Sequence, residues 1–185
     1  MTEIYFVRHG KTDATGKNLC GNLPGFHLNE TGKHQAEETA KYLKKLPIKA
    51  IFASPLERTL ETAVLLAEEH DLAVTRLECL REINFGSFQG MNVEELKQLD
   101  LWNQFWIHPD QVRFPGGETI FETQKRVVEG LNQLTKEFGE EDEIICVAHC
   151  EVIRLAIAAV LELPITQYQR LTIHTASVSK VSWGK

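Results

Sequence analysis

The sequence contains no long hydrophobic run, no cluster of basic residues and no Cys-x-x-Cys pair. No apolar stretch approaches the roughly 20 residues of a membrane-spanning helix. The formal net charge is −6 and the basic residues are dispersed, so neither nucleic acid nor a membrane is expected as a partner. A domain of this size does not need disulfides, so we expect a reduced, cytoplasmic protein. The four cysteines are Cys20, Cys79, Cys146 and Cys150.

Internal repeats, low-complexity segments and linker-like stretches are also absent from the sequence. The 185 residues, 43% of them hydrophobic and 25% charged, suit one globular domain that spans 1–185 and has a sizeable core. The sequence opens on a strand pattern rather than on a basic region followed by an apolar segment, so no signal peptide is expected.

The first ten residues carry the strongest local signal. The apolar run 4–7 predicts a buried strand, and Arg8, His9 and Gly10 follow it directly. Strands of open α/β sheets present functional groups at their carboxyl ends. Arg8 suits a phosphate or a carboxylate, His9 can act as nucleophile, base or metal ligand, and Gly10 permits a tight turn or close approach. A solvated Arg-His pair is the simpler alternative for this tripeptide.

A long polar loop follows over residues 11–30, and a loop of that length is expected to be functional. The cap-type residues 29–31 predict a helix that runs to about Lys45 and is stopped by Pro47. Residues 48–53 then read as a second buried strand.

The turn after this second strand is the next candidate functional segment. Ser54 and Glu57 have the spacing of a capping box, with Pro55 at the first helical position. Arg58 would lie in the first helical turn, where the helix dipole favours acidic residues, and such an exception points to function. An ion pair with Glu57 or Glu61 is the alternative explanation of Arg58.

Residues 73–79 predict a third strand, and the loop-like stretch 80–90 follows it. This loop carries Glu82 among apolar neighbours, which would raise the pKa of its carboxyl toward that of a general acid. Residues 92–108 are expected to be helical. Trp102, Phe105 and Trp106 are expected to belong to the hydrophobic core, and a platform for a ligand is the alternative.

The C-terminal half repeats the alternation of helix and strand. Thr119 and Glu122 predict a second capping box, and the helix behind it is expected to run to Phe138. Residues 143–148 form an apolar strand without alternation, which indicates burial on both faces, and His149 ends it. A helix over 152–161 and strands over 171–174 and 177–183 complete the pattern.

If the sheet is parallel over these strands, their carboxyl ends meet along one edge. Two arginines, two imidazoles and the helix N-termini would then form a pocket for a dianion. The further carboxylic acid suits protonation of a leaving group. This set favours phosphoryl transfer through a histidine nucleophile, with arginines and a second histidine in the role that Mg²⁺ has elsewhere. The converging residues are Arg8, His9, Arg58, Glu82 and His149.

Several ordered motifs resemble those of the histidine phosphatase superfamily, the phosphoglycerate-mutase-like proteins. The resemblance covers nearly the whole chain and implies a three-layer α/β/α fold with a mixed, mainly parallel central sheet. It also implies that His9 becomes phosphohistidine, that Arg8, Arg58 and His149 bind the phosphoryl group, and that Glu82 is the acid and base. The motifs are Val7-Arg8-His9-Gly10 with Thr12, Leu28 to Gly32, Ser54 to Ala63, Leu80 to Gly90, Gly116 to Thr119, and Val147-Ala148-His149.

The sequence departs from the family pattern at several positions around this site. Lys11 stands where Glu or Gln is usual and adds positive charge at the pocket rim. Thr15 replaces an asparagine and offers a shorter hydrogen-bonding group, and Cys150-Glu151 stands where glycines are common. Thr15 and Cys150, with Gly21 of the loop, complete the expected phosphate-binding set. The carboxylate of Glu151 either repels an anionic substrate or points away.

We therefore expect a metal-independent phosphomonoester hydrolase that acts on a small phosphorylated metabolite and needs no cofactor. A phosphoglycerate-type phosphomutase is the alternative, although such mutases carry inserted segments that shield the phosphoenzyme from water. A catalytically silent phosphate-binding protein is the alternative from another class. A zinc site of Cys146, His149 and Cys150 does not have the usual ligand spacing. The oligomeric state is open, with a homodimer as one option.

Overall fold

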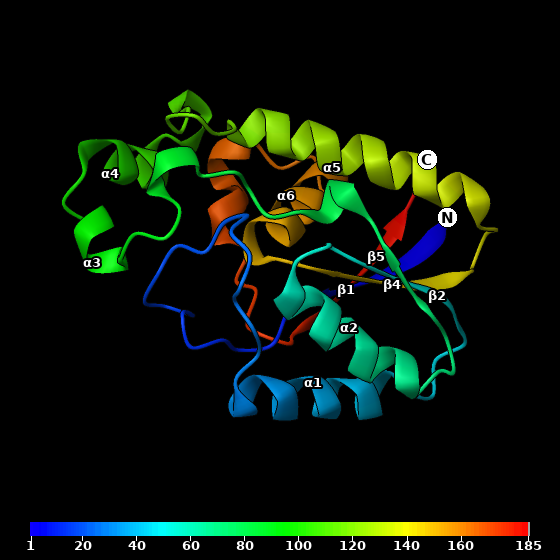
Figure 1. Cartoon of the computed structure of the whole chain (residues 1–185). Helices are drawn as coiled ribbons and strands as arrows, with labels where there is room; N and C mark the ends of the chain where they lie inside the picture. The colour runs from blue at the N-terminus through cyan, green and yellow to red at the C-terminus, as the bar shows by residue number, and fades with distance from the viewer. Residues whose placement is uncertain (185) are drawn as a thin grey trace.

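The central sheet has five strands in the order β3-β2-β4-β1-β5 (Figure 1). In this computed structural model, which describes residues 1–184, the first four of these run parallel and β5 is antiparallel to β1. The expected mixed, mainly parallel sheet is therefore confirmed, and β1, β2 and β4 end along the same edge. The strands are β1 (Thr2–Arg8), β2 (Ile48–Ala53), β3 (Val74–Arg76), β4 (Glu143–Ala148) and β5 (Val178–Trp183).

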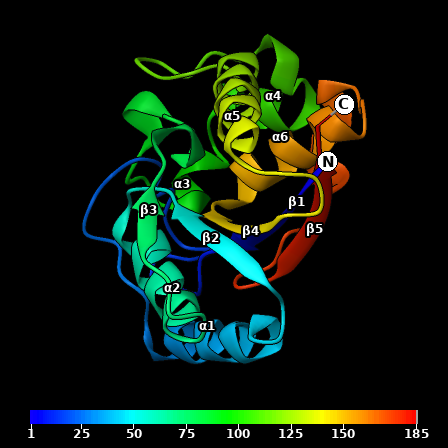
Figure 2. The ribbon, with the colours of Figure 1, turned by 90° about the vertical axis from the view of Figure 1, so that its right-hand side faces the viewer.

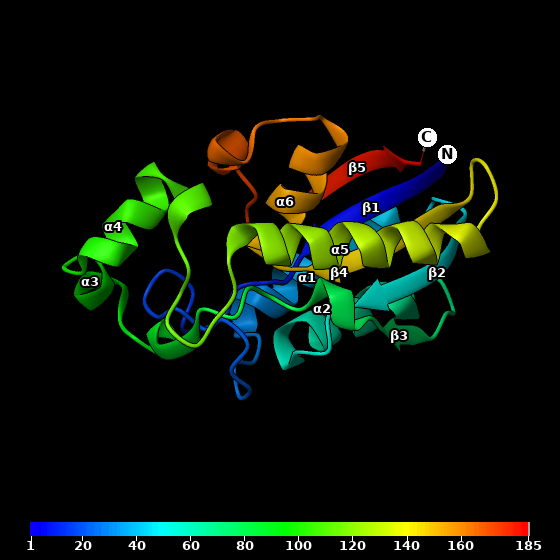
Figure 3. The same cartoon turned by 90° about the horizontal axis from the view of Figure 1, so that it is seen from above.

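Helices cover both faces of the sheet, as expected for a three-layer arrangement. In Figures 1 and 2, α1 and α2 lie below the sheet while α5 and α6 lie above it. Seen from above in Figure 3, α3 and α4 stand beyond the carboxyl ends of the strands. The helices are α1 (Glu30–Leu43), α2 (Glu57–Glu68), α3 (Val93–Leu96), α4 (Asp100–Ile107), α5 (Ile120–Leu134) and α6 (Cys150–Val160). Within residues 1–184, no helix has the length and apolar character that crossing a membrane requires.

Strand β4 is the centre of the hydrophobic core. Because side chains alternate along a strand, Ile144, Cys146 and Ala148 join the core on the α5–α6 side, and Ile145 and Val147 join the core on the α1–α2 side. All five are fully buried. The continuous apolar run thus reflects a strand covered on both faces, as the sequence predicted.

A third apolar cluster lies beyond the sheet and joins the loop that carries Glu82 to α3 and α4. Phe85 packs edge to face against Phe114, with ring centroids 4.9 Å apart, and Phe105 contacts both rings. The expected core role of Trp102 and Phe105 is confirmed, since both are buried, whereas Trp106 is 46% exposed. The predicted helix 92–108 is divided into the short helices α3 and α4.

The predicted strand over residues 171–174 is wrong. The carbonyl oxygens of this segment are used by arginine side chains rather than by a neighbouring strand. Arg8 donates to the Ile173 oxygen at 2.7 Å and Arg154 donates to the Leu171 oxygen at 2.6 Å. The third predicted strand is also shorter than expected, since β3 covers three residues and a 3₁₀ turn begins at Glu78.

One predicted capping box is confirmed and the other is wrong. Thr119 and Glu122 form both reciprocal hydrogen bonds at the start of α5. Helix α2 instead begins at Glu57 with Leu56 as its N-cap, and no side chain caps it. The Ser54 hydroxyl is used elsewhere: it forms a 2.8 Å hydrogen bond with His149.

A close backbone contact fixes the start of α1 against the turn after β1. A Cβ on Gly32 would lie 2.0 Å from the Lys11 oxygen, and a Cβ on Gly10 would lie 2.4 Å from the Gly32 oxygen. Both distances are too short for any other residue, so the two glycines let the helix N-terminus reach the turn directly behind His9.

Gly32→Ala is expected to lower the free energy of unfolding by about 1–3 kcal/mol, because the added methyl group must push backbone atoms apart. Intrinsic helix propensity alone would change the stability by up to about 1 kcal/mol in the opposite direction. Urea unfolding of the variant beside the wild type measures the sign. A variant as stable as the wild type, or more stable, would contradict the close contact.

Candidate active site

The register of the parallel strands brings three strand ends together. Arg8 pairs with Ala148, and Ala53 pairs with Val147, so the residues that follow these strands are neighbours. The His9 N–H donates to the Ala148 oxygen at 3.0 Å, and the Ser54 N–H donates to the Val147 oxygen at 3.0 Å. The pairing of the strands thus fixes the positions of Arg8, His9, Ser54 and His149 relative to one another.

His9 is held with one ring nitrogen directed away from its own backbone. Its Nδ1 lies 2.8 Å from the Gly10 oxygen. A carbonyl oxygen only accepts, so Nδ1 carries the proton and Nε2 keeps its lone pair. Burial, together with the charges of Arg58 and Arg8, lowers the pKa of His9 well below its usual value. The neutral imidazole is the form that a nucleophile needs.

His149 lies beside His9, with ring centroids 5.4 Å apart. Its Nε2 is hydrogen-bonded to the Ser54 hydroxyl, whereas the buried Nδ1 has no hydrogen-bond partner among residues 1–184. Burial and the nearby arginines lower the pKa of His149 well below its usual value. If the Ser54 hydroxyl donates, Nδ1 carries a proton that an incoming anion can accept.

Arg8 and Arg58 present further unused donors. Arg58 is only 2% exposed, and its Nη2 donates to the Gly21 oxygen at 2.8 Å. Within the described chain, Arg8 Nε and Arg58 Nη1 are buried and make no hydrogen bond. The alternative of an ion pair for Arg58 is wrong, because Glu57 accepts from the Gly25 N–H and Glu61 accepts from the Leu28 N–H. Buried cations without a carboxylate partner favour an anion site.

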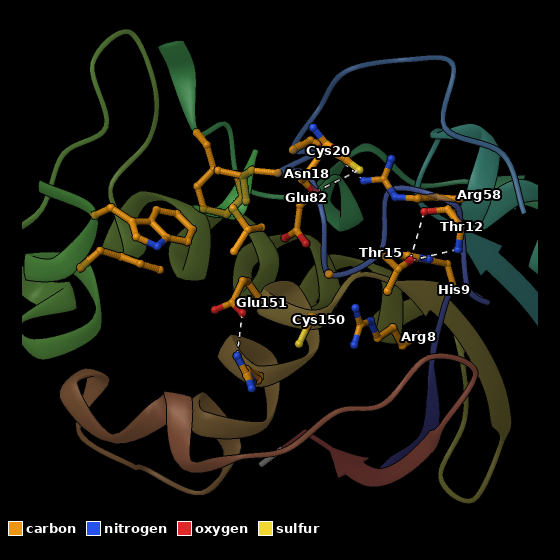
Figure 4. Close-up of a pocket in the computed structure, with 18 of the residues that line it drawn as sticks. Arg8, His9, Thr12, Thr15, Asn18, Cys20, Arg58, Glu82, Cys150 and Glu151 are labelled. Carbon is orange, nitrogen blue, oxygen red and sulfur yellow. Dashed lines mark hydrogen bonds and ion pairs between the residues drawn. The ribbon is translucent and has the colours of Figure 1, made fainter. Parts of the chain in front are cut away.

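Glu82 is buried on the opposite side of the pocket from Arg8 and Arg58 (Figure 4). Burial, followed by the negative charge of Glu151, raises the pKa of Glu82 to about 7, against the opposing effects of the Ile83 N–H and the two arginines. A carboxyl group with this pKa holds its proton near neutral pH, as a general acid must.

Glu151 lines the pocket rather than pointing away from it. Its carboxylate accepts a 2.7 Å hydrogen bond from Arg154, which lies one helical turn further along α6. Figure 4 shows Glu151 and Glu82 on the same side of the pocket. The charge of Glu151 is thus balanced by Arg154, and the pair forms part of the wall next to the acid.

The other expected binding residues also line this pocket, although their own contacts differ. The Thr15 hydroxyl accepts from the Thr12 N–H at 2.9 Å, so it organises the loop. The Gly21 oxygen positions Arg58, as described above, and Cys150 lies between Arg8 and Glu151. Lys11 is exposed and is not among the pocket-lining residues.

The pocket has a volume of about 320 Å³, which suits a small ligand. Its inner end carries Arg8, His9 and Arg58. His149 does not itself line the pocket; it is fully buried directly behind His9. The outer wall of the pocket carries Trp102, Phe105 and Trp106 from α4. The aromatic residues therefore serve both as core and as pocket wall. Among residues 1–184 no three His, Cys, Asp or Glu side chains come together as a potential metal site, and this includes Cys146, His149 and Cys150.

Sequence reasoning identified the five central side chains but missed how they are supported. Ser54 was assigned to a helix cap, although it hydrogen-bonds to His149. The sequence gives no indication that Arg154 pairs with Glu151. Glu118 belongs to the motif Gly116 to Thr119, but nothing in the sequence indicates its pairing with Arg126 or that the pair holds the loop of Glu82 from behind, because these contacts join segments distant in the sequence.

Comparisons with known proteins identify the family of the chain. The family model of the histidine phosphatase superfamily (branch 1) matches residues 4–185. Phosphoserine phosphatase 1 of Hydrogenobacter thermophilus is 28% identical over 183 residues, 98% of this chain and 86% of that protein. A probable phosphoglycerate mutase, GpmB, of Erwinia tasmaniensis is 26% identical over 183 residues, 98% of this chain and 85% of that protein. The solved structure of Bacillus stearothermophilus YhfR superposes with a TM-score of 0.91 at 26% identity and covers 98% of this chain and 91% of that one. The chain belongs to the histidine phosphatase superfamily.

Proposed function

We propose that this chain is a metal-independent phosphomonoester hydrolase that acts on a small phosphorylated metabolite, with residues 1–185 as one catalytic domain. The observation that carries the proposal is the set of buried, unpaired nitrogens around a neutral His9: the donors Arg8 Nε and Arg58 Nη1, and His149 Nδ1, which is a donor when the Ser54 hydroxyl donates to Nε2. Such donors fit the oxygens of a phosphoryl group and its transition-state charge. The relative named as a phosphoserine phosphatase supports the same class of reaction.

The first half-reaction forms a phosphoenzyme. His9 Nε2 attacks phosphorus, and the bond between phosphorus and the ester oxygen breaks. Glu82 donates its proton to the departing oxygen, so that an alcohol leaves rather than an alkoxide. Arg8, Arg58 and His149 stabilise the charge on the phosphoryl oxygens throughout the transfer.

The second half-reaction returns the enzyme to its starting state. The Glu82 carboxylate accepts a proton from water, and the water oxygen attacks phosphorus as the bond to His9 Nε2 breaks. Inorganic phosphate then leaves. A phosphomutase, the activity in the name of one relative, would share the first half-reaction but pass the phosphoryl group to a second hydroxyl. We favour water as the acceptor because the chain is shorter than the shielded mutases that it resembles.

His9→Ala is expected to reduce phosphate release by at least about a thousandfold, because the other nucleophilic groups of the pocket are poorly activated: burial raises the pKa of the Cys20 thiol and raises that of Cys150 to about 12. Phosphate release from a panel of phosphorylated metabolites, assayed in EDTA with wild type and variant side by side, measures this. Retained activity in His9→Ala would contradict a mechanism that passes through phosphohistidine at His9. A wild type that is silent on the whole panel but still binds vanadate would favour a binding protein, and transfer to an added alcohol without phosphate release would favour a mutase.

Glu82→Gln is expected to slow the hydrolysis of alkyl phosphates by about a hundredfold or more, while nitrophenyl phosphate is affected much less. Nitrophenolate leaves without a proton, whereas an alkoxide does not. The measurement is kcat/KM for p-nitrophenyl phosphate and for glycerol 2-phosphate, because kcat/KM reports the first half-reaction alone, whereas kcat also contains the second half-reaction, in which Glu82 acts on both substrates alike. Equal losses on the two substrates would argue against the acid role.

Glu151→Gln is expected to move the alkaline limb of the kcat profile to lower pH. The negative charge of Glu151 raises the pKa of Glu82, so its removal lowers that pKa, and the acid form is lost earlier as the pH rises. The pH dependence of kcat for glycerol 2-phosphate reports the shift. Glu129→Gln, which removes an exposed carboxylate from α5, is the control and should leave the limb in place. An unmoved limb in Glu151→Gln would contradict the coupling between the two carboxyl groups.

A further inference from the structure

Arg126 on α5 holds the backbone of the loop that carries Glu82. Its Nη1 donates to the Cys79 oxygen and to the Arg81 oxygen, each at 2.8 Å, and its Nη2 lies 3.5 Å from the Glu82 oxygen. One guanidinium thus contacts three carbonyl groups within four residues of chain. These carbonyls belong to a segment that forms neither a strand nor an α-helix and would otherwise depend on water.

Glu118 fixes the orientation of that guanidinium. Its two carboxylate oxygens accept from Arg126 Nε and Nη2, both at 3.0 Å, in a bidentate pair. The same carboxylate accepts from the Asn84 N–H at 2.9 Å, and the Glu118 N–H donates to the Asn84 oxygen at 2.8 Å. The pair therefore clamps the loop on both sides of Glu82.

Close backbone contacts make this clamp rigid. A Cβ on Gly117 would lie 2.2 Å from the Asn84 oxygen, and a Cβ on Gly86 would lie 2.0 Å from the Pro115 oxygen. The Ser87 N–H also donates to the Pro115 oxygen at 2.9 Å. The two turns thus interlock behind the pocket.

The Glu82 side chain itself has only a local restraint. Its Oε1 accepts from the N–H of the next residue, Ile83, at 3.0 Å, which is the one hydrogen bond of this carboxyl group within residues 1–184. The direction of the carboxyl group is therefore set by the backbone of residues 81–83. Arg126 does not line the pocket of His9 and lies instead in a separate hollow behind the loop.

We propose that Arg126, oriented by Glu118, is a positioning residue that aims the Glu82 carboxyl group at the ester oxygen of the substrate. The proposal rests on the proposed acid role of Glu82. Proton transfer requires the donor within about 3 Å of the accepting oxygen, so a small shift of residues 81–83 reduces it strongly. Arg8, Arg58 and His149 make no hydrogen bond to residues 79–82 in the described chain; their side chains bond to Ile173, Gly21 and Ser54 instead.

The experiment compares Arg126→Met with wild type on glycerol 2-phosphate and p-nitrophenyl phosphate. Methionine keeps an apolar stem and removes every donor. We expect kcat/KM for glycerol 2-phosphate to fall at least tenfold more than kcat/KM for p-nitrophenyl phosphate, with the Kd for vanadate within about twofold of wild type. In the double variant with Glu82→Gln, the extra loss on glycerol 2-phosphate should disappear, because the proton donor is already absent.

Two further variants distinguish positioning of the Glu82 carboxyl group from a general contribution of Arg126 to the stability of the fold. Arg113→Met removes another arginine that pairs with a glutamate of α5 and donates to the Gly117 oxygen, but it has no contact with residues 79–82, and it should show no substrate selectivity. Arg126→Lys keeps the charge and part of the donor set and should restore part of the selective loss. If Arg126→Met does not fold, Glu118→Gln supplies the same comparison.

The outcomes distinguish this inference from the acid role on which it rests. Selective loss in Glu82→Gln together with equal losses on both substrates in Arg126→Met would overturn the positioning role alone. Equal losses in both variants would overturn the acid role and the positioning role together. A selective loss that adds fully to that of Glu82→Gln would show that Arg126 acts on another step and would also overturn the proposal.

Discussion

The in-register parallel pairing of β1, β4 and β2 is the constraint on which the site depends. Each strand ends one residue before a functional side chain, and the backbone hydrogen bonds at the strand ends continue through His9 and Ser54. A slip of one residue in β1 would turn His9 away from His149 and move buried side chains such as Phe6 and Val7 to the opposite faces of the sheet, where the cores are packed around other residues. The hydrophobic core on both faces of β4 makes such a slip very unfavourable. The geometry of the site is thus a consequence of core packing.

The pKa shifts in the site arise chiefly because titratable side chains are buried away from water. Arg8 and Arg58 lower the pKa of both imidazoles, and burial acts in the same direction, so the histidines stay neutral beside two cations. The same burial raises the pKa of Glu82. One desolvated pocket therefore supplies a neutral nucleophile and a protonated acid at the same pH, because burial disfavours the charged form of each.

Much of this arrangement could be predicted from the sequence, and the features that could not be predicted depend on contacts between segments distant in the chain. Apolar runs that end in Arg8, Ala53 or Ala148 indicated the strands and the shared edge, because burial on two faces leaves a clear pattern. Ser54 was misread because a capping box depends only on local spacing, while its hydroxyl forms a contact 95 residues away. The segment 171–174 was misread because it is extended, although its carbonyl groups bind arginines rather than a strand.

In the proposed mechanism, Glu151 belongs to the part of the pocket that would select the substrate rather than react with it. Of the groups proposed to bind or react with the phosphoryl group, Arg8, His9 and His149 lie at strand ends and are positioned by the sheet, whereas Glu82 lies on a loop held by Arg126. The wall that faces the leaving group comes instead from the start of α6 and from α4, where Glu151, Arg154 and Trp106 lie. These residues are not tied to the strand register, so a substitution among them leaves the backbone positions of Arg8 and His9 unchanged. Glu151 nevertheless acts on Glu82, because its negative charge raises the pKa of that carboxyl group. In the proposed mechanism, a change at Glu151 would therefore alter both the leaving groups that fit and the pH at which they are protonated.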